Sequence, residues 1–133
     1  MNNHIELIRH DGLAPVDYAY AAVIEGQTSS IFTAGACPLD AAGNIVAVGD
    51  YAGQAEQVMS NLTAVLDRSG AGLADVFKTT VYVVSANQAD LVAVWDVIRA
   101  SFGDHDPPST LLGVAALGYR DQLVEVEAVA VTR

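Results

Sequence analysis

Two segments with helical periodicity alternate with strand-like segments, and this alternation restricts the folds open to the chain. Apolar side chains recur every three or four positions in residues 51–69, and again in residues 89–102. Residues 76–84, between the two, are rich in β-branched and aromatic side chains, which is typical of a strand. Because each helix joins two strands, we expect the joined strands to be parallel neighbours connected by right-handed crossovers.

Further strand-like segments occupy residues 5–9, 19–25, 30–36, 110–117 and 123–131. We expect the second and third of these to form a hairpin through residues 26–29, and the last two to form a hairpin through residues 118–121. The predicted order of elements is β-β-β-α-β-α-β-β. A chain of 133 residues fits a single domain spanning residues 1–133, here of the α+β class.

One face of the predicted mixed sheet has no covering layer. Two helices are too few to cover both faces of such a sheet, so we expect both helices on one face. The last strand alternates between an apolar side and a side that carries two glutamates, Glu125 and Glu127. The chain is 52% hydrophobic and only 17% charged. This apolar surplus predicts that another copy of the chain buries the second face.

The charge of the chain argues against several partners. Six basic side chains stand against 16 acidic ones, which gives a net charge of -10. Nucleic acids and anionic membrane surfaces both need clustered lysine and arginine, so we expect neither as a partner. The N-terminus has no signal-peptide pattern and no apolar run is long enough to span a bilayer, so a cytoplasmic protein is expected. The three histidines lack ligand spacing, and we expect no metal.

Several segments, in a fixed order, resemble one protein family. They are residues 20–25, 32–40, 54–66, 76–83 and 123–130. The sequences KTTVYV and LVEVEAVA, within the last two segments, are specific when they occur together in this order. The chain therefore resembles the Rid family (RidA/YjgF, reactive-intermediate deaminases) from about Pro15 to its C-terminus.

The resemblance implies a chorismate-mutase-like fold. It also implies a homotrimer in which the sheets form a central barrel, the helices lie outside, and three ligand clefts lie between subunits. Founding members of the Rid family hydrolyse reactive enamines and imines, such as 2-aminoacrylate, to 2-ketoacids and ammonia. They use no metal and no organic cofactor. The implied partners are therefore a small-molecule ligand and other copies of the same chain.

One departure from the Rid pattern bears on the substrate. In deaminating members an arginine clamps the substrate carboxylate, since a planar guanidinium donates two parallel hydrogen bonds. That arginine lies in a Pro-x-Arg-Ser/Thr segment at the start of a strand. Here the segment reads PPST, and Ser109 stands at the arginine position. We therefore expect poor hydrolysis of small 2-imino acids. Arg120, at the tip of a predicted hairpin, is too distant within one chain to replace the clamp; only a neighbouring subunit could bring it near.

The resemblance points to five site residues, each with a plainer alternative. Glu125 matches the family glutamate that positions the attacking water; otherwise it is a solvated carboxylate. Tyr20 matches a tyrosine that lines the cleft; otherwise it belongs to the core or an interface. Ser109 and Thr110 can hydrogen-bond a ligand, or can satisfy the local backbone. Cys37 lies at a strand end near the family cleft, and is otherwise a small buried apolar side chain.

Other residues receive structural roles. Trp95 lies on the apolar stripe of the second helix and is assigned to the core, and Lys78 is assigned to the strand that contains it. Tyr18 is a weaker candidate than Tyr20 for the cleft. His105 and Asp106 lie near Ser109, but no nucleophile-elbow pattern surrounds the serine, so a Ser-His-Asp triad is not supported.

Three functions remain open at this point. The first is an imine or enamine hydrolase whose substrate lacks the small 2-imino acid shape, suggested by the pairing of Glu125 and Tyr20 with a missing arginine. The second is a non-catalytic trimer that binds a small molecule or acts as a holdase. The third is a ribonuclease, an activity attributed to some relatives, which the acidic charge disfavours.

Overall fold

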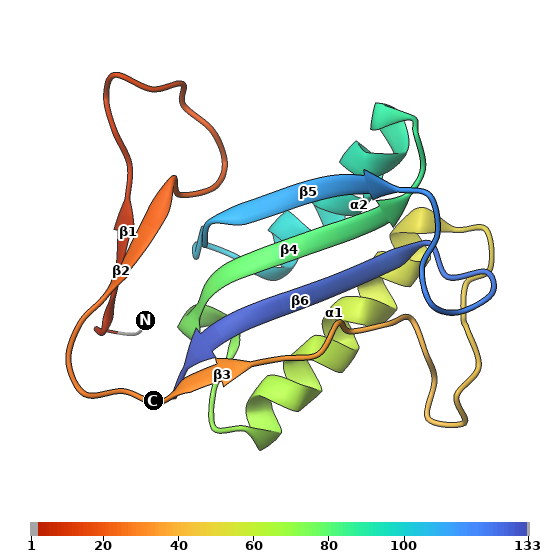
Figure 1. Ribbon diagram of the computed structural model, residues 1–133, viewed down its shortest axis with the longest axis horizontal. Helices are drawn as coiled ribbons and strands as arrows, with labels where there is room; N and C mark the ends of the chain where they lie inside the picture. Colours follow the sequence, from red (N-terminus) through yellow and green to blue (C-terminus); the bar gives the residue numbers. More distant parts are fainter. Residues whose placement is uncertain (1–2, 133) are drawn as a thin grey trace.

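The molecule is built around a four-stranded mixed sheet that carries both long helices on one face (Figure 1). The computed structural model describes residues 3–132. In chain order the elements are β1 (Ile5–Ile8), β2 (Ala21–Ile24), β3 (Ser30–Phe32), α1 (Tyr51–Arg68), the 3-10 helix η1 (Leu73–Asp75), β4 (Val76–Val84), α2 (Gln88–Ser101), β5 (Ser109–Val114) and β6 (Val124–Val131). The α+β class and the order of strands and long helices agree with the sequence-based expectation.

Both long helices begin and end where the sequence indicates. The side chains of Asp50 and Asn87 each accept a hydrogen bond of 3.0 Å from a backbone N–H in the first turn of the helix that follows. Gly70 and Gly103 come just after the helices, with φ of +90° and +62°. A left-handed residue at this position ends a helix, and glycine adopts it at little cost.

The core lies between the helices and the buried faces of β4 and β6. The alternation predicted for β6 is confirmed, because every second side chain from Val124 to Ala130 is at most 2% exposed. The bulky core side chains that are almost completely buried include Val58, Leu62, Leu66, Val76, Val81, Val83, Val94, Ile98, Val124 and Val126.

The strand order of the sheet is β3-β6-β4-β5, and it corrects two predicted pairings. The helix α2 does connect parallel neighbours, β4 and β5. The strands joined through α1 are not neighbours, because β6 lies between β3 and β4. The predicted hairpin of the last two strands is wrong for a similar reason, since β4 lies between β5 and β6. β4 and β6 suit the central positions because they are long strands with an alternating buried face. Each can pair with a neighbouring strand along both edges.

The first two strands form a separate ribbon that projects from the side of the main sheet (Figure 1). β1 pairs with β2 in antiparallel register from Ile5 opposite Ile24 to Ile8 opposite Ala21. The predicted hairpin through residues 26–29 is therefore wrong, because β2 pairs with β1 and β3 pairs with β6. The segment between β2 and β3 is a connection between two sheets.

Asp106 attaches this ribbon to the main body. Its carboxylate lies 2.7 Å from the Arg9 guanidinium, next to β1, and 2.6 Å from the Arg99 guanidinium of α2. Its backbone carbonyl accepts a hydrogen bond from the Ala19 N–H at 2.9 Å. Asp106, three positions before the start of β5 at Ser109, thus holds the ribbon and α2 together.

A buried glutamine is hydrogen-bonded to the end of the loop that connects β5 to β6. Gln54 of α1 is fully buried, and its amide nitrogen donates to the Asp121 carbonyl at 2.9 Å while its amide oxygen accepts from the Leu123 N–H at 2.8 Å. Because a buried amide needs such partners, Gln54 fixes where the chain enters β6.

Replacing Gln54 with methionine is expected to destabilise the protein. Gln54→Met keeps the side-chain length but leaves two backbone groups without partners, and we expect the free energy of unfolding to fall by roughly 2–4 kcal/mol. The measurement is urea denaturation at one fixed protein concentration. Glu56→Met, at an exposed position of the same helix, is the control and should change the value by less than about 0.5 kcal/mol. Equal effects of the two variants would contradict this role for Gln54.

Candidate functional site

The face of the sheet that the helices leave open carries most of its polar side chains. Glu125 and Glu127 point to this face from β6, as the alternation predicts, and lie opposite Tyr82 and Thr80 of β4. The Tyr82 hydroxyl donates to Glu127 Oε1 at 2.8 Å, and this hydrogen bond raises the pKa of the Tyr82 phenol above its usual value. Glu127 is therefore hydrogen-bonded to the Tyr82 phenol, whereas Glu125 is hydrogen-bonded to other side chains.

The Glu125 carboxylate is held through one of its two oxygens. Gln122 Nε2 donates to Oε1 at 3.1 Å, and the Cys37 thiol approaches the same oxygen at 3.4 Å. Gln122 is only 3% exposed, and its amide is also bonded to the backbone of Tyr119 and Val124. Within residues 3–132, Oε2 accepts no hydrogen bond. The arrangement leaves one fixed carboxylate oxygen and one oxygen free for water.

Gly35 makes room for this carboxylate. A Cβ atom at residue 35 would lie 2.2 Å from Glu125 Oε2, far inside contact distance. The backbone that follows β3 can therefore pass beside the free carboxylate oxygen only because residue 35 has no side chain.

Cys37 is a neutral hydrogen-bond donor here. Burial, together with the hydrogen bond to Glu125 and the charge of that carboxylate, raises the pKa of the Cys37 thiol to about 11. The thiolate is the nucleophilic form of cysteine, and at neutral pH almost none is present. The arrangement suits a group that orients Glu125 and does not suit a covalent nucleophile.

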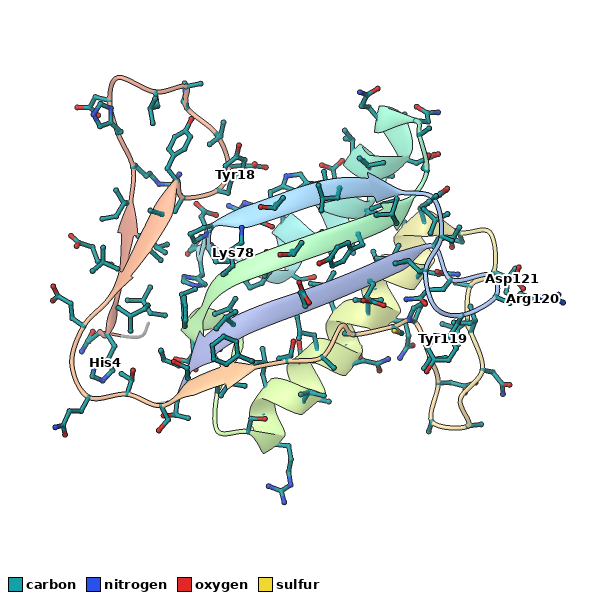
Figure 2. All side chains as sticks on the ribbon, in the orientation of Figure 1. His4, Tyr18, Lys78, Tyr119, Arg120 and Asp121 are labelled. Atoms are coloured by element: carbon teal, nitrogen blue, oxygen red, sulfur yellow. The ribbon has the colours of Figure 1, made fainter. Side chains whose placement is uncertain are left out.

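Ser109 and Thr110 lie on the edge strand β5, beside an open hollow of about 400 Å³. The hollow is lined by these two residues together with Leu111, Tyr18 and Trp95. The Ser109 hydroxyl oxygen accepts a hydrogen bond from the buried Thr79 hydroxyl, and the Thr110 hydroxyl oxygen accepts one from the Lys78 ammonium at 2.8 Å. Lys78 is labelled in Figure 2 near the start of β4.

Trp95 is not the core residue that its place on the helix stripe predicts. Its side chain is partly exposed, and the indole N–H donates to the Asp17 carboxylate at 2.9 Å. The ring meets that of Tyr18 edge to face, with centroids 6.1 Å apart and an interplanar angle of 88°. The segment before β2 therefore comes to the exposed side of α2, a contact that helical periodicity could not indicate.

Tyr20 lines a different hollow from Ser109. Its hydroxyl donates to the Ala14 carbonyl at 2.6 Å, and it borders an open space of about 380 Å³ formed by residues 9–16. Its ring meets the Tyr18 ring at a centroid distance of 6.1 Å. Tyr20 thus reaches the Ser109 hollow only through Tyr18, and within one chain Tyr18 is the tyrosine that lines it.

The structure does not bring Glu125 and Ser109 together within one chain. Ser109 pairs with Thr79 and Glu125 pairs with Tyr82, so the two lie on opposite sides of β4 and three positions apart along it. With a rise of about 3.3 Å per residue and strands about 4.8 Å apart, their Cα atoms are roughly 14 Å apart. Residues three positions apart in a strand also face opposite sides.

Arg120 does not approach Ser109 within the chain. It lies in the loop after β5, at the end of the sheet away from Lys78 (Figure 2). Its side chain is exposed, together with that of the neighbouring Tyr119. The expectation that Arg120 is too distant to act in one chain agrees with this placement.

Residues 3–132 contain neither a membrane-spanning helix nor a cluster of metal-ligating side chains. No helix in this range is long and apolar enough to cross a membrane. No group of three histidine, cysteine or acidic side chains in this range has an arrangement that could hold a metal ion.

The sequence model of a known family matches residues 13–132, almost the whole chain, and is described as endoribonuclease L-PSP. The chain belongs to this family, the Rid (RidA/YjgF) family. A protein of the Rid family from Yersinia pestis, YyfB, whose function is described as unknown, has a crystal structure with a TM-score of 0.87 and 31% sequence identity, covering 96% of this chain and 98% of that one.

Two curated Rid relatives show how the names in the family differ. A RutC family protein of Pyrococcus abyssi is 36% identical over 100 residues, which are 75% of this chain and 76% of that protein. A protein of Salmonella typhimurium named 2-iminobutanoate/2-iminopropanoate deaminase is 34% identical over 108 residues, which are 79% of this chain and 81% of that protein. The Rid assignment made from the sequence is confirmed.

Sequence reasoning missed three contributors to the site of this Rid protein. Gln122 lies between the predicted turn, residues 118–121, and the predicted strand, residues 123–131, and only its position three residues before Glu125 could have drawn attention to it. Trp95 was assigned to the core, and Tyr18 was ranked below Tyr20. For Trp95 and Tyr18 the deciding information is a contact between segments distant in sequence, which a periodic pattern does not contain.

The rate at which Cys37 is alkylated should depend on the negative charge of the Glu125 carboxylate. We expect wild-type Cys37 to react slowly with iodoacetamide at pH 8.5, since its raised pKa leaves little thiolate. Glu125→Gln removes the negative charge and the thiol–carboxylate hydrogen bond, so the pKa of Cys37 should fall and alkylation should become severalfold faster. Glu127→Gln, on the same strand and face, is the control and should leave the rate unchanged. An unchanged rate in Glu125→Gln would show that the two side chains do not interact.

Proposed function

We propose that this Rid protein hydrolyses an imine, or the enamine in equilibrium with it, to a carbonyl compound and ammonia. The observation that carries the proposal is the Glu125 carboxylate, with Oε1 held by two donors and Oε2 free beside Gly35. The names of relatives that are 2-iminobutanoate/2-iminopropanoate deaminases support the same class of reaction.

Glu125 has the chemistry that the reaction needs. The imine nitrogen first takes a proton from solvent. Glu125 Oε2 then accepts a proton from a water molecule as the water oxygen adds to the iminium carbon, which gives a neutral tetrahedral carbinolamine. Return of that proton to the nitrogen allows the carbon–nitrogen bond to break, and the carbinolamine hydroxyl proton is lost as the carbonyl forms and ammonia leaves. General acid–base help of this kind contributes about 10²–10⁴ in rate.

We propose that small 2-imino acids are poor substrates, because Ser109 occupies the place of the arginine that clamps the carboxylate in deaminating relatives. Ser109 supplies one neutral hydroxyl, and that oxygen already accepts a hydrogen bond from Thr79. A hydrogen bond to a charged group contributes roughly 1.5–3 kcal/mol, so the absence of the guanidinium corresponds to about one to two orders of magnitude in affinity.

We also propose that the working form is a cytoplasmic homotrimer with ligand clefts between subunits. Glu125 and Ser109 face opposite sides of the sheet within one chain, so a cleft that uses both needs two copies. Phe32 is 78% exposed and Leu112 is 42% exposed. Their register places both on the open face, which is the face expected to form the central barrel.

A charge placed on the open face should break the assembly. Phe32→Glu is expected to convert the trimer into monomers, since it brings a carboxylate into an apolar contact. Val65→Glu, at a position of α1 that is 50% exposed, lies on the outer side and should leave the trimer intact. Sedimentation velocity measures both. A wild-type protein that sediments as a monomer would refute the proposed cleft.

The enzymatic test compares wild type, Ser109→Arg and Glu125→Gln on 2-iminopropanoate generated in situ by a dehydratase. We expect wild type to be slow, Ser109→Arg to be faster by about one to two orders of magnitude in kcat/KM, and Glu125→Gln to be inactive on every imine that wild type accepts. Fast hydrolysis by wild type would show that another group anchors the carboxylate.

A non-catalytic binding module is the second candidate, and the neutral side chain at residue 109, where deaminating relatives carry an arginine, favours it. Tight binding of a small molecule without any product, by wild type and by Ser109→Arg alike, would favour this candidate over the hydrolase.

A further inference from the structure

The hollow beside Ser109 has an aromatic wall whose rings are held in place. Trp95 is fixed by its hydrogen bond of 2.9 Å to Asp17, and Tyr18 packs edge to face against it at 6.1 Å. Tyr20 supports Tyr18 from the other side. Ring positions fixed in this way are ready to receive a flat apolar group without loss of side-chain freedom.

The hydroxyls of Ser109 and Thr110 each have one proton to donate. Ser109 and Thr110 both accept a hydrogen bond through their oxygens, from Thr79 and Lys78 respectively. A hydroxyl has one proton to donate, and in both residues that proton is not used in these contacts. The Lys78 charge polarises the Thr110 hydroxyl and strengthens it as a donor. Adjacent residues of a strand face opposite sides, so Thr110 faces the open side of the sheet with Lys78, and Ser109 faces the helix side with Trp95. The Ser109 hydroxyl therefore suits an uncharged acceptor, such as an imine nitrogen or a carbonyl oxygen.

Among residues 3–132, no charged side chain lines the hollow. The two nearby arginines are engaged elsewhere, since Arg9 and Arg99 both pair with Asp106. Arg99 also donates to the Gly103 carbonyl at 2.7 Å, and Arg9 donates to the Tyr18 carbonyl at 2.9 Å. The side chains that surround the hollow offer no guanidinium for a bidentate carboxylate contact.

We infer that this hollow binds the aromatic substituent of an uncharged imine, and of the ketone or aldehyde formed from it. The aryl group packs against Tyr18, Trp95 and Leu111, and the nitrogen or carbonyl oxygen accepts from the Ser109 hydroxyl. The inference rests on the proposed function and names its substrate class. A space of about 400 Å³ lies within the range of small-molecule sites.

Fluorescence provides a direct test, because Trp95 is the single tryptophan of the chain. Wild-type protein is titrated with 4-phenylbutan-2-one as an aryl ketone, with butan-2-one as its counterpart without the ring, and with pyruvate as a small 2-ketoacid. We expect saturable quenching by 4-phenylbutan-2-one only. Quenching by pyruvate with equal or higher affinity, or no saturable response to the aryl ketone, would overturn the inference.

Variants locate the binding by ligand-observed NMR, which does not depend on the fluorophore. Trp95→Ala should weaken binding of 4-phenylbutan-2-one by about tenfold, and Trp95→Phe, which keeps a ring and guards against misfolding, should recover most of the affinity. Tyr119→Ala removes an exposed tyrosine at the far end of the sheet (Figure 2) and is the control. Unchanged affinity in Trp95→Ala would also overturn the inference.

The inference and the proposed function can fail separately. If 4-phenylbutan-2-one binds at Trp95 but no aryl imine is hydrolysed faster than in buffer, the binding site stands and the hydrolase proposal fails. If imines are hydrolysed with dependence on Glu125 but Trp95→Ala has the same KM for aryl and alkyl imines as wild type, the hydrolase stands and the aromatic site fails.

Discussion

The ladder between β4 and β6, with β5 on the other side of β4, determines where every functional group of this protein lies. It buries alternate valines of both strands under the helices and turns Glu125 and Glu127 toward the open face. The parallel pairing with β5 then places Ser109 on the helix side of the sheet. A slip of one residue would exchange the two faces, so the apolar side of β6 fixes both core and chemistry.

Two different environments result from this arrangement. The Glu125 carboxylate lies among buried amide and thiol donors, with Gly35 leaving space beside its free oxygen. The hollow at Ser109 is neutral and aromatic, although the chain carries a net charge of -10. Asp106 contributes to that neutrality, because it pairs with the two arginines nearest to the hollow. One environment suits handling of water, and the other suits recognition of an uncharged group.

Local patterns predicted the elements well and the pairings poorly. Helix limits, caps and the two-sided character of β6 depend on residues within one turn or one strand, so the sequence contains them directly. The two hairpins were predicted because sequential strands usually pair. They are wrong because β4 and β6 take the central positions of the sheet. β4 therefore separates β5 from β6, and β3 pairs with β6 and not with β2. Trp95 lay on an apolar stripe, and only the approach of Asp17 and Tyr18 showed that its indole faces a hollow.

The sequence by itself determined the α+β class, the order of elements and membership of the Rid family, and it predicted Glu125 and Ser109 as site residues. These depend on periodicity, on local capping and on the identity of single residues. The tertiary structure decided which side chains surround those two positions. Cys37, from the segment after β3, reaches Glu125 of β6, Trp95 of α2 meets Tyr18 from the segment before β2, and β4 separates Ser109 from Glu125. Such contacts arise from long-range packing free energy, which a local pattern in the sequence does not encode.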